Sequence, residues 1–178
     1  MKMRILVVVD MQNDFINGSL GTDEAQKIVP AVVKKIKSLE KGDAVLITVD
    51  THDKDYFDTL EGKKLPVKHC ARGTDGWKIN EEVWDALAEA GLKGVAFEFF
   101  EKPTFGCKEL AQRWISPEDE IEVCGLCTDI CVISNALLLR MAHPNTKITV
   151  DSNATAGVTS ETKEAALTAM RMCQIDVI

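Results

Sequence analysis

The chain has 178 residues, of which 46% are hydrophobic and 28% charged, a composition typical of a globular protein with a sizeable core. Its net charge of −7 disfavours nucleic acid and anionic membrane as main partners. No apolar run approaches the roughly 20 residues that span a bilayer, and Asp10 interrupts the first run too early for a signal peptide. We therefore expect a cytoplasmic protein whose cysteines are reduced thiols.

Short β-branched apolar runs alternate along the chain with segments of helical periodicity. In chain order, the pattern predicts a strand at 4–10, a helix at 23–42, a strand at 44–50, a helix at 80–91, strands at 94–99 and 120–125, a helix at 128–142, a strand at 147–152 and a helix at 160–173. Residues 174–178 allow one more strand. In the first helix Thr22 or Asp23 is the expected N-cap and Gly42 the stop, while Pro30 indicates a start or a kink.

This alternation predicts an α/β fold in three layers, with a mainly parallel central sheet and helices on both faces. No repeat, linker or change of composition divides the chain, so we expect a single domain over residues 1–178. Ligands of such sheets bind beyond the carboxyl ends of the strands. The polar residues expected there are Asp10, Asp50 with His52, Lys102 and the cysteine-rich segment 122–142.

Three of the six cysteines lie within eight residues of that segment. Cys131 falls in the first turn of the predicted helix, where free N–H groups and the helix dipole favour a thiolate with a lowered pKa. The position fits a nucleophile and a core residue about equally well. Cys124 lies inside a strand and is expected to be a buried hydrophobic residue. A zinc pair of Cys127 and Cys131 is less favoured, because no second closely spaced pair of cysteines follows.

Several motifs together resemble the isochorismatase-like cysteine hydrolases, and among these the nicotinamidases. They cover most of the chain in the order of that family: "LVVVDMQNDF" (6–15), "VDTHD" (49–53), "HCARGT" (69–74), "EKPTFGC" (101–107) and "VCGLCTDICVISNA" (123–136). The resemblance implies a Rossmann-like fold and a catalytic triad of Asp10, Lys102 and Cys131. It also implies a cis peptide bond between Leu126 and Cys127, with an oxyanion hole formed by the N–H groups of Cys127 and Cys131.

The residues themselves leave other roles open. Asp10 is also suited to cap a loop or helix, and Lys102 to lie on the surface in solvent. In the triad, Asp10 would accept the thiol proton, and Lys102 would favour the ionised forms of both partners.

A second group of residues has the chemistry of a metal site. Two of the three histidines lie near acids in one segment, and nitrogen with carboxylate ligands suits zinc, manganese or iron. The resemblance assigns a divalent metal, most typically zinc, to Asp50, His52 and His69. The family's usual further histidine is Tyr56 here, so we expect Glu61 as the fourth ligand. The alternative is a solvated acidic loop.

The resemblance implies hydrolysis of a small amide, nicotinamide, to nicotinate, with the metal orienting the substrate and Phe15 and Phe105 flanking its ring. Such a protein needs no macromolecular partner, although a homo-oligomer remains open. Three alternatives stand beside this interpretation. They are a family member that acts on another small amide or carbamoyl compound, a receiver-like signalling domain and a non-catalytic thiol or metal-binding protein.

Overall fold

The computed structural model describes residues 2–178, which form one six-stranded sheet in the order β3-β2-β1-β4-β5-β6. Every neighbouring pair of strands in it is parallel, which confirms the predicted α/β fold. The strands are β1 (Arg4–Val9), β2 (Ala44–Asp50), β3 (Ala96–Lys102), β4 (Glu120–Leu126), β5 (Lys147–Ala156) and β6 (Asp176–Val177). The strand order reverses between β1 and β4, and this reversal is where open α/β sheets form their binding crevice.

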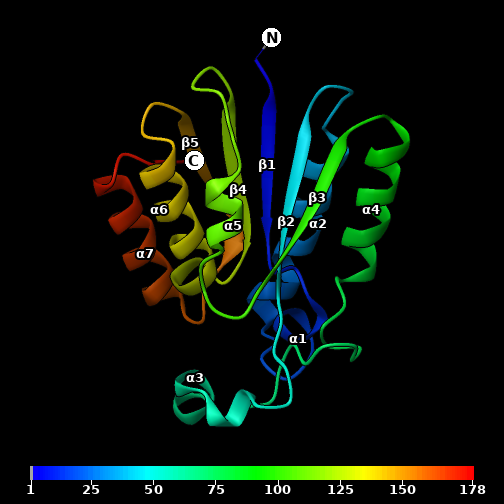
Figure 1. Cartoon of the computed structure of the whole chain (residues 1–178), viewed down its shortest axis with the longest axis vertical. Helices are drawn as coiled ribbons and strands as arrows, with labels where there is room; N and C mark the ends of the chain where they lie inside the picture. Colours follow the sequence, from blue (N-terminus) through cyan, green and yellow to red (C-terminus); the bar gives the residue numbers. More distant parts are fainter. Residues whose placement is uncertain (1) are drawn as a thin grey trace.

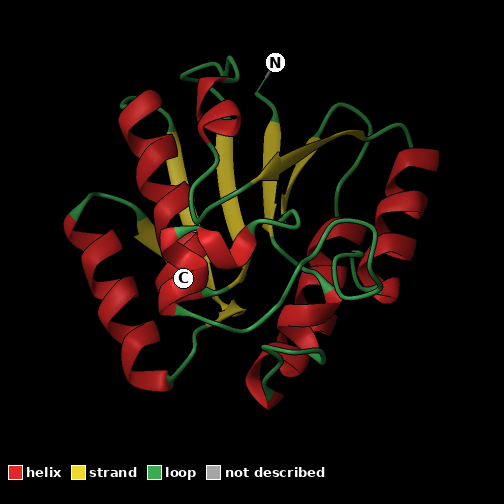
Figure 2. Ribbon diagram, turned by 60° about the horizontal axis from the view of Figure 1, so that its bottom comes forward, coloured by secondary structure: helices red, strands yellow, loops and turns green. Residues whose placement is uncertain are grey.

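Helices cover both faces of the sheet, which gives three layers (Figures 1 and 2). One face packs against α2 (Asp23–Lys37) and α4 (Glu81–Leu92), and the other against α5 (Lys108–Gln112), α6 (Ile133–Ala142) and α7 (Ser160–Met172). Along β1, Leu6 and Val8 point to the first face, whereas Ile5, Val7 and Val9 point to the second. Burial on both faces explains why the central strands are continuous apolar runs.

Several boundaries differ from the predictions. β3 begins at Ala96 and not at residue 94, because Gly94 adopts a positive φ of 89° in the turn after α4. The first long helix ends at Lys37, and Gly42 instead forms the turn into β2 with a φ of 103°. Pro30 lies inside α2 on its exposed side.

The predicted helix at 128–142 is divided into two parts. A π-helical turn covers Thr128–Val132 and α6 follows it from Ile133, while β5 continues to Ala156. The sequence patterns did not indicate the short helices α1 (Asn13–Ile16), α3 (Leu60–Lys64), α5 and the 3-10 turn Tyr56–Asp58. Elements of three to five residues are too short to establish a periodicity.

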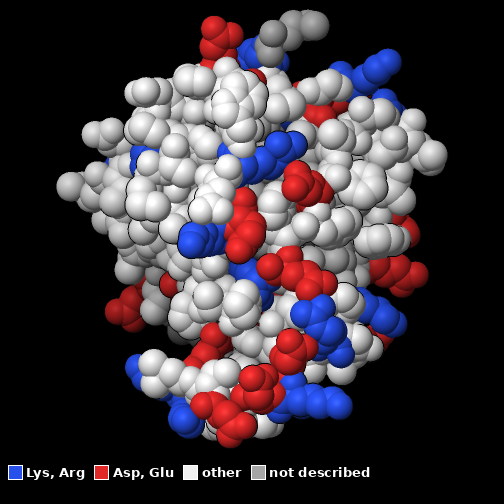
Figure 3. All heavy atoms as spheres, viewed as in Figure 1, with Lys and Arg blue, Asp and Glu red and all other residues white. Residues whose placement is uncertain are grey.

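The chain between β2 and α4 forms a long excursion beyond the carboxyl ends of the strands. It carries the turn Tyr56–Asp58 and α3, which stands away from the sheet at the bottom of Figure 1. Acidic and basic side chains are intermingled over this lower end of the molecule (Figure 3). Among residues 2–178, no helix has the length and apolar character that crossing a bilayer requires.

Candidate active site

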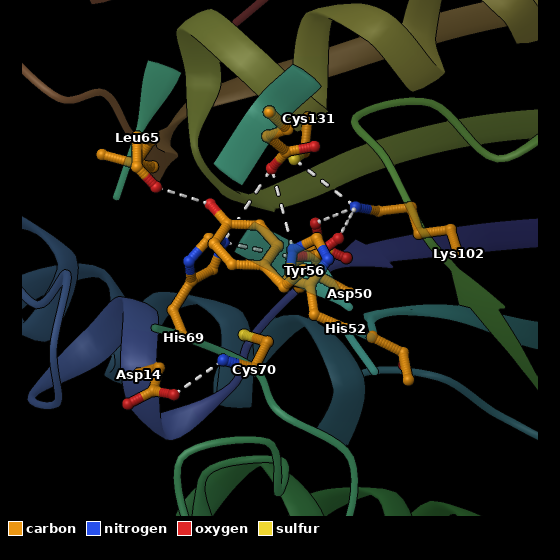
Figure 4. Close-up of polar contacts among 12 residues, drawn as sticks. Asp14, Asp50, His52, Tyr56, Leu65, His69, Cys70, Lys102 and Cys131 are labelled. Atoms are coloured by element: carbon orange, nitrogen blue, oxygen red, sulfur yellow. Dashed lines mark hydrogen bonds and ion pairs between the residues drawn. The ribbon is translucent and has the colours of Figure 1, made fainter. Parts of the chain in front are cut away.

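Four strands each deliver one polar side chain to the edge of the sheet beside the strand reversal. Asp10 follows β1, Asp50 ends β2, Lys102 ends β3, and Cys131 lies in the π-helical turn after β4. Lys102 Nζ lies 2.7 Å from Asp10 Oδ2, 3.1 Å from Asp50 Oδ1 and 3.5 Å from Cys131 Sγ. Figure 4 shows the ammonium group pointing at the Asp50 carboxylate and at the sulfur.

The backbone at Asp10 and Gly125 brings β1 and β4 close together at this point. Asp10 has a φ of 47°, in the left-handed region that non-glycine residues rarely adopt. Gly125, with a φ of 114°, lies against β1, and a Cβ there would be 2.1 Å from the Val9 carbonyl oxygen. Only glycine fits this position, because it combines a positive φ with direct backbone contact. The peptide bond between Leu126 and Cys127 is cis, as predicted.

Lys102 is 1% exposed, so its charge depends on its partners. Burial alone would lower the pKa of Lys102, but the negative charges that Asp10, Cys131 and Asp50 carry when ionised raise it above its ordinary value. Lys102 is therefore an ammonium ion at neutral pH. For Asp10, burial raises the pKa, and the opposing charge of Lys102 offsets only part of this effect.

The expected lowering of the Cys131 pKa is wrong for this arrangement of groups. Burial raises the pKa of the thiol well above its ordinary value, Asp10 raises it further, and Lys102 opposes both effects. The prediction considered only the start of the helix and not the apolar surroundings of the sulfur. In the resting site the proton therefore remains on sulfur, next to a carboxylate whose raised pKa suits it to accept that proton.

The metal-like group is also assembled by the fold. One ligand atom each from Asp50, His52 and His69 lies within 4.8 Å of the others, and all three residues are buried. His52 Nε2 is 3.0 Å from Asp50 Oδ2 yet makes no hydrogen bond there. In His69, Nδ1 lies 2.8 Å from the Val67 carbonyl oxygen, which fixes the proton on Nδ1 and leaves Nε2 free as a ligand. A ring nitrogen without a hydrogen bond and a carboxylate that faces it fit a shared cation.

Glu61 of α3 lies next to this group. Its Oε1 is 3.7 Å from His52 Nε2 and 4.0 Å from His69 Nε2. Burial raises the pKa of Glu61, and the nearby Asp50 charge adds to this effect. Tyr56 presents no ligand, since its ring packs on both histidines and its hydroxyl donates to the Leu65 carbonyl oxygen. The residue at the usual histidine position therefore supports the site by packing.

A cavity of about 240 Å³ opens between the sulfur and this group. Its walls are mainly apolar and include both phenylalanines predicted to contact the substrate, Phe15 and Phe105. Cys127 and Cys131 line it beside each other, and Asp50, Glu61 and His69 reach it from the opposite group. The dimensions and walls suit a small flat ring with one polar substituent.

Gln12 is a buried residue beside the site that the sequence patterns did not indicate. Gln12 accepts a 2.7 Å hydrogen bond from the Asp50 N–H and donates 2.8 Å bonds to the carbonyl oxygens of Asp50 and Trp77. It therefore fixes the main chain on both sides of the Asp50 side chain. The sequence signal for this role was the position of Gln12, a polar residue two positions after the predicted strand 4–10.

Comparison with known proteins agrees with this arrangement. The Isochorismatase domain model matches residues 4–178, so the chain belongs to the isochorismatase family of hydrolases. A nicotinamidase/pyrazinamidase of Mycobacterium tuberculosis is 30% identical over 99% of this chain and 98% of its own length. The crystal structure of a nicotinamidase/pyrazinamidase from Bacillus subtilis is 28% identical, covers 99% of both chains and superimposes with a TM-score of 0.81.

A more distant structure extends the likeness of the fold. The pyrazinamidase of Pyrococcus horikoshii in complex with zinc is 23% identical, covers 98% of both chains and has a TM-score of 0.75. At 23% identity, this similarity shows a shared fold and nothing about a shared function. Membership of the hydrolase family disfavours the receiver-like alternative.

Proposed function

We propose that this hydrolase is a nicotinamidase, which converts nicotinamide and water to nicotinate and ammonia. The observation that carries the proposal is the cluster of Asp10, Lys102 and Cys131, in which Cys131 also lines an apolar cavity. The similarity to nicotinamidases over the full chain supports the choice of substrate.

In the first half of the reaction, Asp10 accepts the proton of the Cys131 thiol while the sulfur attacks the amide carbon. The C=O bond becomes a C–O⁻ single bond in a tetrahedral intermediate, and the N–H groups of Cys127 and Cys131 stabilise the oxyanion. When the intermediate collapses, the C–N bond breaks and Asp10 returns its proton to the departing nitrogen. Ammonia leaves and a thioester remains on Cys131.

In the second half, Asp10 removes a proton from a water molecule, whose oxygen attacks the thioester carbon. The C–S bond breaks, the acid product forms and the sulfur regains a proton from Asp10. Lys102 keeps its charge throughout. Its contacts with both groups hold the Asp10 carboxylate in position and lower the energy of the transient thiolate.

The residues that would hold a divalent ion are Asp50, His52 and His69, with Glu61 beside them. Zinc, manganese and iron all suit this set of nitrogen and carboxylate ligands. When bound, such an ion would serve as a template that orients the ring nitrogen of the substrate. Phe15 and Phe105 would then hold the two sides of the ring.

The decisive experiment is ammonia release from nicotinamide by the wild type, Cys131→Ala and Cys127→Ala. The proposal requires loss of activity in Cys131→Ala with an unchanged circular dichroism spectrum, and substantial activity in Cys127→Ala, which keeps its N–H group. Turnover that survives Cys131→Ala would exclude the mechanism.

Tyr56 at the usual histidine position supports a second candidate, a family amidase for another small amide or carbamoyl compound. A panel of nicotinamide, pyrazinamide and aliphatic amides separates the two activities. A folded wild type that binds zinc yet releases no ammonia from any of them would instead favour the non-catalytic alternative.

A further inference from the structure

Asn135 is a fully buried polar residue of α6, one turn after Cys131, and the mechanism above does not use it. Its Nδ2 donates a 2.8 Å hydrogen bond to the Cys131 carbonyl oxygen and a 3.2 Å bond to the Phe105 carbonyl oxygen. Its Oδ1 accepts a 2.8 Å bond from the Cys107 N–H. One side-chain amide thus joins the turn that carries the thiol to the loop that carries Phe105.

Three backbone partners fix the orientation of this amide. Two of them are carbonyl oxygens, which only the NH₂ group can serve, and the third is an N–H, which only the oxygen can serve. A flipped amide would leave all three contacts unsatisfied, and a buried unsatisfied group destabilises the fold. The arrangement therefore holds the loop from both sides of Gly106.

The loop itself lies directly on α6. A Cβ at Gly106 would be 2.6 Å from Leu138 Cδ1, so the backbone approaches the helix as closely as glycine permits. The loop starts at Lys102, which the sheet and two carboxylates hold in place. Phe105, in contrast, is 44% exposed and lines the cavity, so its position depends on how its own backbone is held.

We propose that Asn135 is a positioning residue that sets the place of Phe105 against the substrate ring, and thereby the preference for aromatic over aliphatic amides. The inference rests on the proposed function, since it concerns the same cavity. Asn135 acts through the Phe105 backbone and does not touch the substrate. Loosening the loop should weaken ring binding and leave the chemistry at the sulfur nearly intact, because β3 still holds Lys102 and the π-helical turn still holds Cys131.

The principal variant is Asn135→Ser. A serine hydroxyl on a helix reaches the carbonyl oxygen four residues earlier, so it keeps the bond to Cys131 but is too short to reach the loop. We expect KM for nicotinamide to rise about tenfold and kcat to change less than about threefold, the scale of one or two lost hydrogen bonds. Activity toward an aliphatic amide should change little. Asn135→Thr, which fills more of the space, replaces it if the serine variant is unstable.

Ser134→Ala is the matched control. The Ser134 hydroxyl donates a 2.6 Å bond to the Ile130 carbonyl oxygen in the same helix but makes no hydrogen bond to the loop. Ser134→Ala should therefore leave KM for nicotinamide unchanged. Hydrogen exchange at the Cys107 amide provides a readout without turnover, because the Asn135 variants remove the acceptor of that N–H and its exchange should quicken.

A double-mutant cycle with Phe105→Leu tests whether Asn135 acts through Phe105. If it does, Asn135→Ser adds almost nothing to the KM of Phe105→Leu. Additive effects on KM, a fall in kcat alone or unchanged exchange at Cys107 would each overturn the inference. A wild type inactive on nicotinamide would instead show that the proposed function is wrong, so the two failures are distinguishable.

Discussion

The Thr48 hydroxyl donates a 2.6 Å hydrogen bond to Oδ1 of Asp10 from inside the neighbouring strand β2. Its oxygen also lies 3.3 Å from the Asp10 N–H, as an acceptor. Lys102 contacts the other carboxylate oxygen, so Asp10 is held from two directions. A carboxylate fixed in this way meets the thiol proton without reorganising first, which is how oriented groups lower a barrier.

Thr48→Val should therefore reduce kcat for ammonia release by about tenfold or more, with a smaller effect on KM. Valine has nearly the same shape, so the fold should persist. Thr48→Ser restores the hydroxyl and should recover most of the rate. Steady-state kinetics of the two variants check this, and equal activity in wild type and Thr48→Val would contradict it.

Removal of divalent metal should abolish or strongly reduce turnover, and adding zinc, manganese or iron back should restore it. Elemental analysis should find bound metal in the wild type but little in His52→Ala or His69→Ala.

Glu61→Gln should weaken metal affinity by about 10- to 100-fold, the scale of lost supporting ligands. Asp58→Asn, an exposed acid of the same excursion, is the control and should behave like the wild type. Full activity after exhaustive chelation would remove the metal from the proposal.

Gly125→Ala should destabilise the protein by about 4 kcal/mol or more, or prevent folding, because its Cβ would overlap the Val9 carbonyl group. Gly42→Ala offers a matched comparison, since Gly42 also has a positive φ but no atom lies within 4 Å of its Cβ position. Gly42→Ala should lower the free energy of unfolding by only about 1 kcal/mol, because backbone strain is the sole cause. Urea denaturation measures both changes. Similar losses in the two variants would refute the close contact of β1 and β4.

A half-buried ion-pair cluster outside the residues that line the cavity predicts a dependence of stability on pH. Lys35 of α2 pairs with Asp151 of β5 and Glu122 of β4. For Asp151, burial acts to raise the pKa, but the hydrogen bond and charge of Lys35 and the N–H groups of Asn153 and Ala154 together outweigh burial, so the pKa falls below its ordinary value. A lowered folded-state pKa stabilises the fold above the unfolded value of about 3.9, and this contribution is lost as pH falls through the folded-state pKa.

Asp151→Asn should thus lower the free energy of unfolding by about 1 kcal/mol at pH 7, and by progressively less as pH falls below about 4. Denaturant titrations at several pH values test this. Asp176→Asn, an exposed acid on the adjacent strand β6, should show no such trend. A loss from Asp151→Asn that is equal at pH 7 and pH 3 would argue against the ion pair as its cause.

The sequence predicted the positions of residues that lie at strand ends. It did not predict the roles of residues that depend on contacts between distant segments. Asp10, Asp50 and Lys102 were placed at one edge because parallel strands end together, and the cis bond at Leu126 followed from the family motif. The roles of Gln12 and Asn135 depend on which backbone groups they meet across the fold. No local sequence pattern indicates these contacts with distant backbone groups.

Two other errors have the same origin. The pKa of Cys131 was predicted from its place in a helix, whereas its apolar surroundings come from several elements. The start of β3 was misplaced because Val95 continues the apolar run, although its N–H donates back to Ala90 at the end of α4. Periodicity cannot separate a strand residue from an apolar residue that closes a helix.

The reversal of strand order also bears on how the chain assembles this cluster of side chains. Asp10, Asp50 and Lys102 all lie on the N-terminal side of residue 131, in or next to β1, β2 and β3, whereas Cys131 follows β4. Cys131 therefore reaches Lys102 only when β4 pairs with β1. A fragment that ends before β4 contains Asp10, Asp50 and Lys102 but not Cys131, so the pairing of β4 with β1 is the step that completes the cluster.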